Sequence, residues 1–426
     1  GGQDNEPLPG VNVLEKGTSN GTITDLDGQF TLNVAEDAVL TISYIGYTPQ
    51  EITVKGQSFL NISLLEDAEI LDEVVVIGYG VQKKSVVTAS IARVTSDDLA
   101  GVAPVRVDNA LKGLASGVQV TTTSGQPGAS AKVRVRGIGT TNNSDPLYIV
   151  DGMAIDGGID YLNPNDIASI EVLKDAASGA VYGARAANGV VLITTKSGKE
   201  GKVRVTYDFS YGWQRPWKER EMLNGTEYAT LMNEASNYAG KGDMYANPGQ
   251  YGKGTNWQKE TFNYDAPVQN HQVSISGASE KSNYYLSLGY YDQEGIVGGD
   301  YGRSNYERLS IRTNATYTLF DDKSRNWLNK MVIGVNAAYS RINNTSIETN
   351  SLTGSALGNA LFLSPLMKVY AENEQELINQ YADQIEKGNF GSLVRDAKNG
   401  RLLEVPHKDF NEISNPLGYL SLPGEK

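Results

Sequence analysis

The stretch LDEVVVIGYGVQKK, residues 71–84, divides this 426-residue sequence into parts with different patterns. Its centre, Val74 to Ile77, is a β-branched run without alternation, preceded by two acidic residues and followed by Gly78-Tyr79-Gly80. Such a run predicts a β-strand. No turn-linked partner strand is evident beside it. The strand is therefore expected either to be an edge that pairs with another chain or to join a neighbouring sheet, and the pattern leaves both open.

The residues before this stretch, 1–66, predict a small β domain built from short strands and tight turns. In so short a segment, a two-sheet sandwich is the natural way to bury the apolar faces. Residues 67–84 then form a linker. The expected strands of the first domain are Val11–Leu14, Gly21–Thr24, Phe30–Val34, Val39–Tyr44, Glu51–Val54 and Leu60–Leu64.

Residues 85–200 mix short helices with strands and predict an α/β domain. A helix is expected over Val107–Ala115, where Asp108 lies near its start and glycines lie near its end. The segment Lys132–Arg136 alternates charged and apolar residues, which places Arg134 and Arg136 on one face of a strand. Further strands are expected at Gly117–Thr122, Leu147–Val150 and Gly189–Thr195, and Asp151-Gly152 reads as a turn.

Residues 201–426 begin with long alternating strands. In VRVTYDFSYGW, residues 203–213, apolar and aromatic side chains occupy one face and polar side chains the other. Similar runs lie near residues 268–277, 286–290, 308–319 and 331–340. Alternation over about 10 residues is typical of transmembrane barrel strands, whereas strands of soluble sandwiches are usually nearer ~5–6 residues. Short and long connections also alternate, as they do in outer-membrane barrels.

The segment Asn343–Lys426 reads as loops and small helices, including Glu372–Glu386. About five strands do not close a barrel, and a closed barrel has no open edge. The expectation is therefore that the sequence is an N-terminal portion of a longer polypeptide. The predicted fold class is mainly β: a small β-sandwich, an α/β domain and part of a transmembrane antiparallel β-barrel.

Composition excludes several functions. With 37 basic and 50 acidic residues the net charge is −13, which argues against nucleic acid as a partner. The absence of cysteine excludes thiol catalysis and thiolate metal sites, and two histidines argue against a multi-histidine metal centre. No nucleophile motif or phosphate-binding loop is present, and the carboxylates Glu171 and Asp175 are most simply a solvated face. The sequence therefore predicts no enzyme, no metal and no cofactor.

Two runs resemble a known family. VRVRGIGTTNNSDPLYIVDG, residues 133–152, and NPNDIASIEVLKDAASGAVYGARAANGVVLITTK, residues 163–196, are similar to the plug domain of SusC/RagA-type TonB-dependent outer-membrane transporters. The motifs PLPGVNV, NGTITDLDGQFTL and ISYIGY of the first domain resemble the carboxypeptidase-regulatory-like extension of many of these transporters. The resemblance extends almost continuously over residues 7–200. It implies that 85–200 is a plug and that 201–426 is the start of a barrel with long extracellular loops.

The stretch LDEVVVIGYGVQKK resembles the family's linker with its TonB box, the segment that binds TonB. The resemblance implies that an extended strand here is added to the edge of a TonB sheet in the periplasm, with ExbB and ExbD supplying the energy. The implied binding residues are Asp72, Glu73, Val74, Val75, Val76, Ile77, Gly78 and Tyr79.

By the same resemblance, the protein imports an oligosaccharide or a peptide across an outer membrane, with a SusD-like surface lipoprotein as a lid. An oligosaccharide is the favoured cargo. The first domain and the TonB box are then periplasmic, and lipid surrounds the barrel. Arg134 and Arg136 are candidates for plug–barrel contacts, with solvated strand charges as the alternative. Loop aromatics such as Trp213, Trp217, Trp257 and Tyr245 could stack on sugars, although an interface girdle or loop packing is favoured. A signalling receptor and a surface adhesin are the rival functions.

Overall fold

The computed structural model describes two compact units, Gly1–Ser90 with Asp175–Ala184, and Ile91–Lys174 with Arg185–Lys426. No helix within the described residues is long and apolar enough to span a membrane. The residues not described are 1–7, 9, 19, 26, 45–48, 58, 65–73, 78–79, 84–90, 103–105, 136, 138–143, 157, 175–181, 183–185, 323–326, 388–392, 407–412 and 423–426.

The first domain is an antiparallel sheet in the order β2-β1-β3-β4, formed by β1 (Asn12–Glu15), β2 (Gly21–Ile23), β3 (Val39–Ser43) and β4 (Gln50–Thr53). Two of the six predicted strands, Phe30–Val34 and Leu60–Leu64, have no ladder pairing in the described residues. They are extended segments whose alternate apolar side chains pack onto the core. Alternating apolar residues can thus reflect a segment that buries one side against the core, without pairing to another strand.

The β-branched run of the linker forms strand β5 (Val74–Ile77), as predicted. The expectation that it lacks a turn-linked partner was wrong. It pairs antiparallel with β6 (Gly80–Lys83), with Val76 opposite Val81 and Val75 opposite Gln82. The two strands form a separate two-stranded sheet. Of the predicted TonB-box residues, Asp72, Glu73, Gly78 and Tyr79 lie outside the described residues.

The plug is built on a sheet in the order β11-β10-β13-β12-β7. Strands β10 (Leu147–Val150) and β13 (Val190–Thr195) are parallel, and β12 (Ile167–Leu173) pairs antiparallel with β13 and with the edge strand β7 (Ile91–Thr95). Their nearly continuous apolar sequences suit strands that are buried on both faces. The remaining elements are β11 (Met153–Ile155), the hairpin β8 (Val118–Thr122) and β9 (Ala131–Val135), helices α2 (Ser96–Val102) and α3 (Val107–Ala110), and the 3₁₀ turn η2 (Pro164–Asp166).

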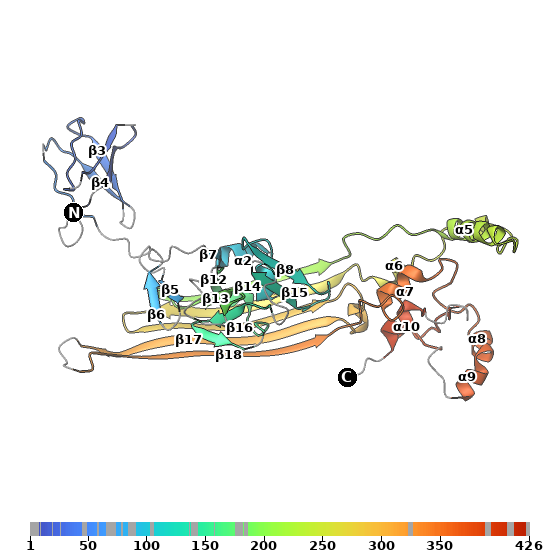
Figure 1. The fold of residues 1–426 in the computed structure, drawn as a ribbon. Coiled ribbons are helices and arrows are strands. Elements are labelled where there is room, and N and C mark those ends of the chain that lie inside the picture. The colour runs from blue at the N-terminus through green and yellow to red at the C-terminus, as the bar shows by residue number, and fades with distance from the viewer. Residues whose placement is uncertain are drawn as a thin grey trace. The chain divides into compact units, whose positions relative to one another are not determined.

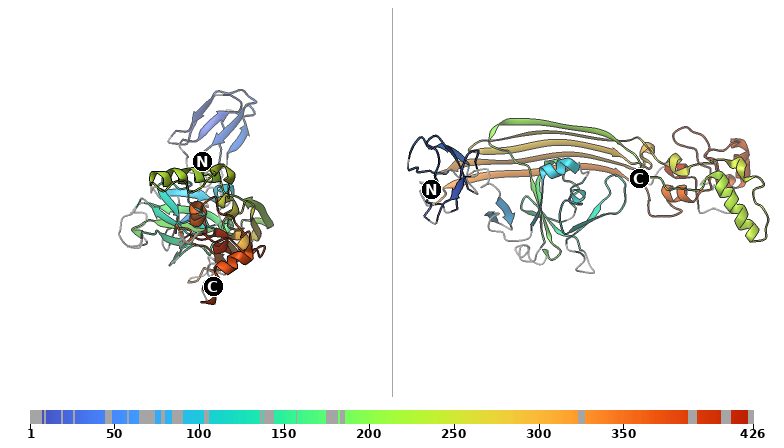
Figure 2. Two further views of the ribbon diagram at one scale, coloured as in Figure 1. Left: turned by 90° about the vertical axis from the view of Figure 1, so that its right-hand side faces the viewer. Right: turned by 90° about the horizontal axis from the view of Figure 1, so that it is seen from above.

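Five long antiparallel strands follow in sequence order, and we call them the wall sheet (Figures 1 and 2). The plug lies against one face of this sheet (Figure 2). All five strands are longer than the sequence runs that predicted them. They are β14 (Gly201–Gln214), β15 (Ala266–Ala278), β16 (Ser282–Glu294), β17 (Asn305–Asp321) and β18 (Lys330–Thr345).

The wall sheet reverses the usual distribution of polarity. Arg308, Ser310 and Arg312 are 2%, 5% and 4% exposed, whereas the intervening Leu309 and Ile311 are 36% and 41% exposed. Register extends this pattern across the sheet, because Tyr207, Val273, Leu288, Ile311 and Tyr339 form one continuous outward row. A sheet with an apolar outer face and a polar inner face is the pattern of a membrane barrel wall.

At one end of the wall sheet, which we call the apical end, the connections form small helices (Figure 1). The predicted helical region Glu372–Glu386 is confirmed as α8 and α9. The helices are α5 (Gly225–Tyr238), η4 (Pro248–Tyr251), α6 (Trp257–Thr261), η5 (Gly299–Tyr301), α7 (Ala356–Phe362), α8 (Glu374–Gln380), α9 (Ala382–Glu386) and α10 (Pro416–Ser421).

The plug core gives a first prediction. Ile170 is 0% exposed and lies between Ile193 on β13 and Val94 on β7. Replacing it with Ala leaves a cavity and is expected to destabilise the plug by about 2–5 kcal/mol. Hydrogen exchange of the β12 and β13 amides should accelerate accordingly. Met153→Ala is the matched control, because Met153 is 69% exposed. Equal exchange in the two variants would contradict the assigned core.

Candidate functional site: the plug–wall contact and the apical pocket

The centre of the plug–wall contact is an ion pair between Asp151 of the plug and Arg312 of β17. The Asp151 carboxylate also accepts hydrogen bonds from the Thr195 amide at 2.9 Å, the Thr195 hydroxyl at 2.8 Å and the Asn336 side chain at 2.6 Å. Four donors from two parts of the chain therefore meet on one carboxylate. Because Arg312 is buried, this carboxylate supplies the counter-charge that a buried guanidinium needs.

Local sequence explains why Asp151 is in this place. It follows the buried strand β10 and forms with Gly152 the two-residue turn that leads into β11. Both residues have positive φ, +47° for Asp151 and +84° for Gly152. A turn of this kind favours Asp-Gly, because Asp tolerates the left-handed region better than most residues. The turn directs the carboxylate toward the wall sheet.

A second polar contact lies around Asp166, which is 2% exposed. Its carboxylate accepts hydrogen bonds from Gln272 at 2.7 Å and from the Tyr285 hydroxyl at 2.9 Å, both on the wall sheet. Nearby, the Asn163 amide donates to Gln272 and Ser310, each at 3.2 Å. Buried polar groups of the plug and of the wall sheet thus satisfy one another.

Gly289 on β16 permits the close approach at this contact. A Cβ atom there would lie 2.7 Å from the Ser310 hydroxyl and nearer still to the Asn163 amide nitrogen. Any side chain would push the plug away from the wall sheet. The glycine therefore allows the plug to lie close to β16 at this point.

Two further contacts lie toward the ends of the wall sheet. At the basal end, opposite the helices, Asn283 and the Gly198 backbone exchange two hydrogen bonds of 2.7 and 2.8 Å. At the apical end, Gln126 from the β8–β9 connection exchanges two hydrogen bonds of 2.8 Å with the Ile347 backbone. Hydrogen bonds therefore join the plug to the wall sheet at its basal end, in its middle and at its apical end.

Electrostatics inside the plug hold the apical connection in place. Burial disfavours the charged form of Arg106 and is the largest single effect on its pKa, but the hydrogen bonds to Asp108 and the negative charges of Asp108 and Asp160 together outweigh it and raise the pKa. Asp108 also accepts from the Ala131 amide at 3.3 Å. Burial raises the pKa of Tyr148, and the Asp108 carboxylate raises it further, so Tyr148 remains a neutral phenol at physiological pH.

Of the two predicted contact residues, the structure describes Arg134 but not Arg136. Arg134 lies half-buried on β9 opposite Gln119, and no hydrogen bond or ion pair joins it to the wall sheet within the described residues. Arg136 lies outside those residues. Their role as plug–barrel contacts stays a prediction. The ion pair that the structure does show has the opposite polarity, with the carboxylate on the plug and the guanidinium on the wall.

Sequence reasoning missed Asp151 because Asp-Gly after a strand is sufficiently explained as a turn. Two inward arginines at positions 308 and 312 of an otherwise uncharged strand face were the available signal, since buried guanidinium groups require acceptors. Among the loop aromatics, Trp257 is 3% exposed and donates its indole N–H to the Ser364 carbonyl at 2.9 Å. Of the two favoured interpretations, interface girdle and loop packing, loop packing is confirmed for this residue.

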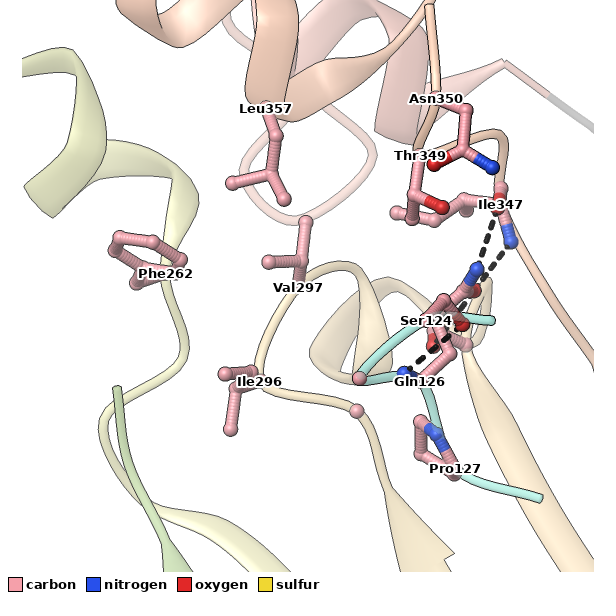
Figure 3. Close-up of a pocket in the computed structure, with 13 residues that line it drawn as sticks. Ser124, Gln126, Pro127, Phe262, Ile296, Val297, Ile347, Thr349, Asn350 and Leu357 are labelled. Atoms are coloured by element: carbon pink, nitrogen blue, oxygen red, sulfur yellow. Dashed lines mark hydrogen bonds between the residues drawn. The ribbon is translucent and has the colours of Figure 1, made fainter. Parts of the chain in front are cut away.

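A pocket of about 210 Å³ lies at the apical end, between the plug connection 124–127 and the wall-sheet loops (Figure 3). Phe262, Ile296, Val297 and Leu357 line one side, and Ser124, Gln126, Thr349 and Asn350 lie on the other (Figure 3). The hydrogen bonds between Gln126 and Ile347 close one edge. In the part of the chain that the structure describes, no group of His, Asp and Glu is arranged to hold a metal ion.

Comparison with known proteins agrees with this arrangement. The TonB-dependent Receptor Plug Domain model matches residues 83–190, and the CarboxypepD_reg-like domain model matches residues 2–76. The TonB-dependent receptor SusC of Bacteroides thetaiotaomicron is 38% identical over 380 residues, which cover 87% of this chain and 35% of SusC. A TonB-dependent receptor of Formosa agariphila is 39% identical over 377 residues, covering 87% of this chain and 36% of that receptor.

Among solved structures, the RagAB peptide importer in its open-open state matches with a TM-score of 0.56 and 34% identity, over 68% of this chain and 34% of that chain. Its closed-closed state matches with a TM-score of 0.54 and 32% identity, over 66% of this chain and 34% of that chain. This chain thus spans about a third of the length of the relatives it matches. The matched relatives are receptors rather than enzymes. The chain belongs to the SusC/RagA-type TonB-dependent receptors and has the domain order of their N-terminal portion.

Proposed function

We propose that the protein imports a nutrient across a Gram-negative outer membrane in a TonB-dependent manner. One observation carries this proposal: a plug is held by buried polar contacts against the polar face of a sheet whose other face is apolar. The apolar face suits contact with lipid, and the polar face suits a lumen that the plug fills. The similarity to SusC and RagAB supports the same function.

The proposed energy input is a TonB protein, working with ExbB and ExbD, that binds the stretch from Asp72 to Tyr79 in the periplasm. Among the residues that the structure describes, strand β5 pairs with β6 alone. Its other edge can therefore accept a further strand through backbone hydrogen bonds. In this proposal β6 gives the segment an extended conformation before the partner arrives, which reduces the entropy lost on binding.

A SusD-like lipoprotein is the proposed lid at the apical end. Trp217 and Tyr238 in the first apical connection are each 97% exposed. Exposed aromatic side chains of this kind suit a protein interface. Of the two expected cargo classes, the oligosaccharide stays a prediction. The peptide class gains support from the similarity to a peptide importer and from the apolar lining of the apical pocket.

Strand addition at β5 can be tested by Val76→Pro. Hydrogen-bonded and non-hydrogen-bonded pairs alternate along an antiparallel hairpin, and Ile77 opposite Gly80 is the hydrogen-bonded pair that closes it, so the N–H of Val76 points away from β6 to the free edge. Proline removes this donor. We expect the full-length receptor with this change to lose binding of the periplasmic TonB domain and to lose receptor-dependent growth on its cargo. Val76→Thr keeps the donor and the β-branched shape, so it should retain both. Growth unaffected by Val76→Pro would refute TonB-dependent import.

The role of the Asp151–Arg312 ion pair can be tested by Asp151→Asn. Removing one member of a buried pair leaves an uncompensated charge, which is expected to destabilise the contact by about 3–5 kcal/mol. Faster hydrogen exchange at β10 and β13, together with ion leakage through the receptor in planar bilayers, should follow.

Two companion variants make this test specific. Asp97→Asn changes an exposed carboxylate of the plug and should have no effect on exchange or leakage. The double variant Asp151→Asn with Arg312→Gln removes both charges and should recover part of the loss. If Asp151→Asn behaves like Asp97→Asn, the ion pair does not hold the plug.

A further inference from the structure

The apical pocket has the size of a single side chain. Its volume is about 210 Å³. An engineered apolar cavity of about 150 Å³ is enough to bind benzene, whereas pockets for whole drug-sized ligands are usually about 300–1,000 Å³. The pocket therefore suits a branched aliphatic or aromatic group rather than a whole oligosaccharide.

The chemistry of the lining points to the same class of ligand. Phe262, Ile296, Val297 and Leu357 present carbon atoms to the space. Gln126, the largest polar side chain in the lining, already uses its amide oxygen and nitrogen on the Ile347 backbone. A sugar hydroxyl facing these apolar walls would lose its hydrogen bonds to water without gaining a partner, whereas an apolar group gains from burial there.

The pocket is also preformed. Val297 and Ile347 are buried, and they pack in one cluster with Ala356 of α7 and Leu420 of α10. The hydrogen bonds of Ile347 to Gln126 fix the opposite side against the plug. A ligand group that enters a rigid apolar site loses less free energy to reorganisation of the protein.

Polar groups stand beside the apolar space. The side chains of Thr349 and Asn350 have no hydrogen-bond partner among the residues that the structure describes. A hydroxyl and a carboxamide together offer both donors and acceptors, which suits the N–H and C=O groups of a peptide backbone. An apolar space with amide-compatible groups beside it fits an amino-acid residue within a peptide.

We propose that the apical pocket binds one aliphatic or aromatic side chain of a peptide cargo, with Thr349 and Asn350 contacting the adjacent peptide backbone. This inference rests on the import function proposed above and assigns its cargo class. It makes the pocket a determinant of specificity, because peptides without such a side chain lose the burial of apolar surface. Because both the plug and the wall-sheet loops line the pocket, the bound side chain would contact both parts.

The test uses the detergent-solubilised full-length receptor and two pools of random nonapeptides. One pool contains Leu, Ile, Val and Phe, and the other has Ser and Asn in their place. Peptides that co-elute with the receptor are quantified by mass spectrometry. Retention of the apolar pool should exceed that of the polar pool at least about tenfold. Equal retention of the pools would overturn the proposal.

Variants of lining residues test whether the preference for the apolar pool arises in the pocket. Leu357→Asn makes the lining polar, and Thr349→Phe fills the space from its other side. Each should remove most of the preference for the apolar pool. Leu352→Asn is the matched control, because Leu352 is 68% exposed and does not line the pocket, and it should behave as the parent. If both pocket variants retain the parent preference, the proposal is wrong.

Photo-crosslinking gives a readout that needs no variant. A pool carrying photo-leucine should label the parent receptor at residues 296–297 or 347–357, and labelling confined to other regions would overturn the assignment. Val76→Pro should leave peptide retention unchanged, because no TonB is present in the assay. Retention of a linear glucose hexasaccharide without retention of the apolar pool would refute the pocket inference but leave import standing. Growth unaffected by Val76→Pro would refute import but leave peptide binding standing.

Discussion

Strand β17 of the wall sheet directs Arg308 and Arg312 inward, and the rest of the structure depends on this constraint. A guanidinium that is shielded from water requires acceptors, and the strands of the sheet supply few of them. The plug supplies Asp151 to Arg312, and it supplies the Leu162 carbonyl and the Asn163 side chain to Arg308 at 3.4 Å each. Plug and wall are therefore electrostatically complementary surfaces.

The contacts along this interface differ in kind. In the middle, carboxylates of the plug meet a guanidinium, amides and a phenol in buried surroundings. At the two ends, Asn283 and Gln126 instead bond backbone groups. Hydrogen bonds that involve a charged group contribute more than neutral ones. The middle is thus the strongest part of the contact, and the ends are the easier parts to separate.

The sequence could predict those structural features whose pattern lies in neighbouring residues, and not those that join distant residues. The strands of the wall sheet were predictable because alternation over many residues has few competing explanations. The partner of β5 was missed because GVQK begins with glycine and is short, so its strand propensity is weak even though only two residues separate it from β5. Phe30–Val34 has the alternation of a strand, but it pairs with no other strand in the part of the chain that the structure describes. The contact between Asp151 and Arg312 joins residues 161 positions apart, and no local pattern encodes such a pairing.

The conformation of Asp151 has a consequence for which sequences can occupy that position. Its backbone has φ of +47°, and its side chain must carry a negative charge to Arg312. Glycine would accept the backbone conformation but lacks the charge. Glutamate has the charge but is less tolerant of the left-handed region, and asparagine has the tolerance without the charge. Aspartate alone meets both demands, so this position should admit almost no exchange even though an Asp-Gly turn on a protein surface would ordinarily be among its most variable features.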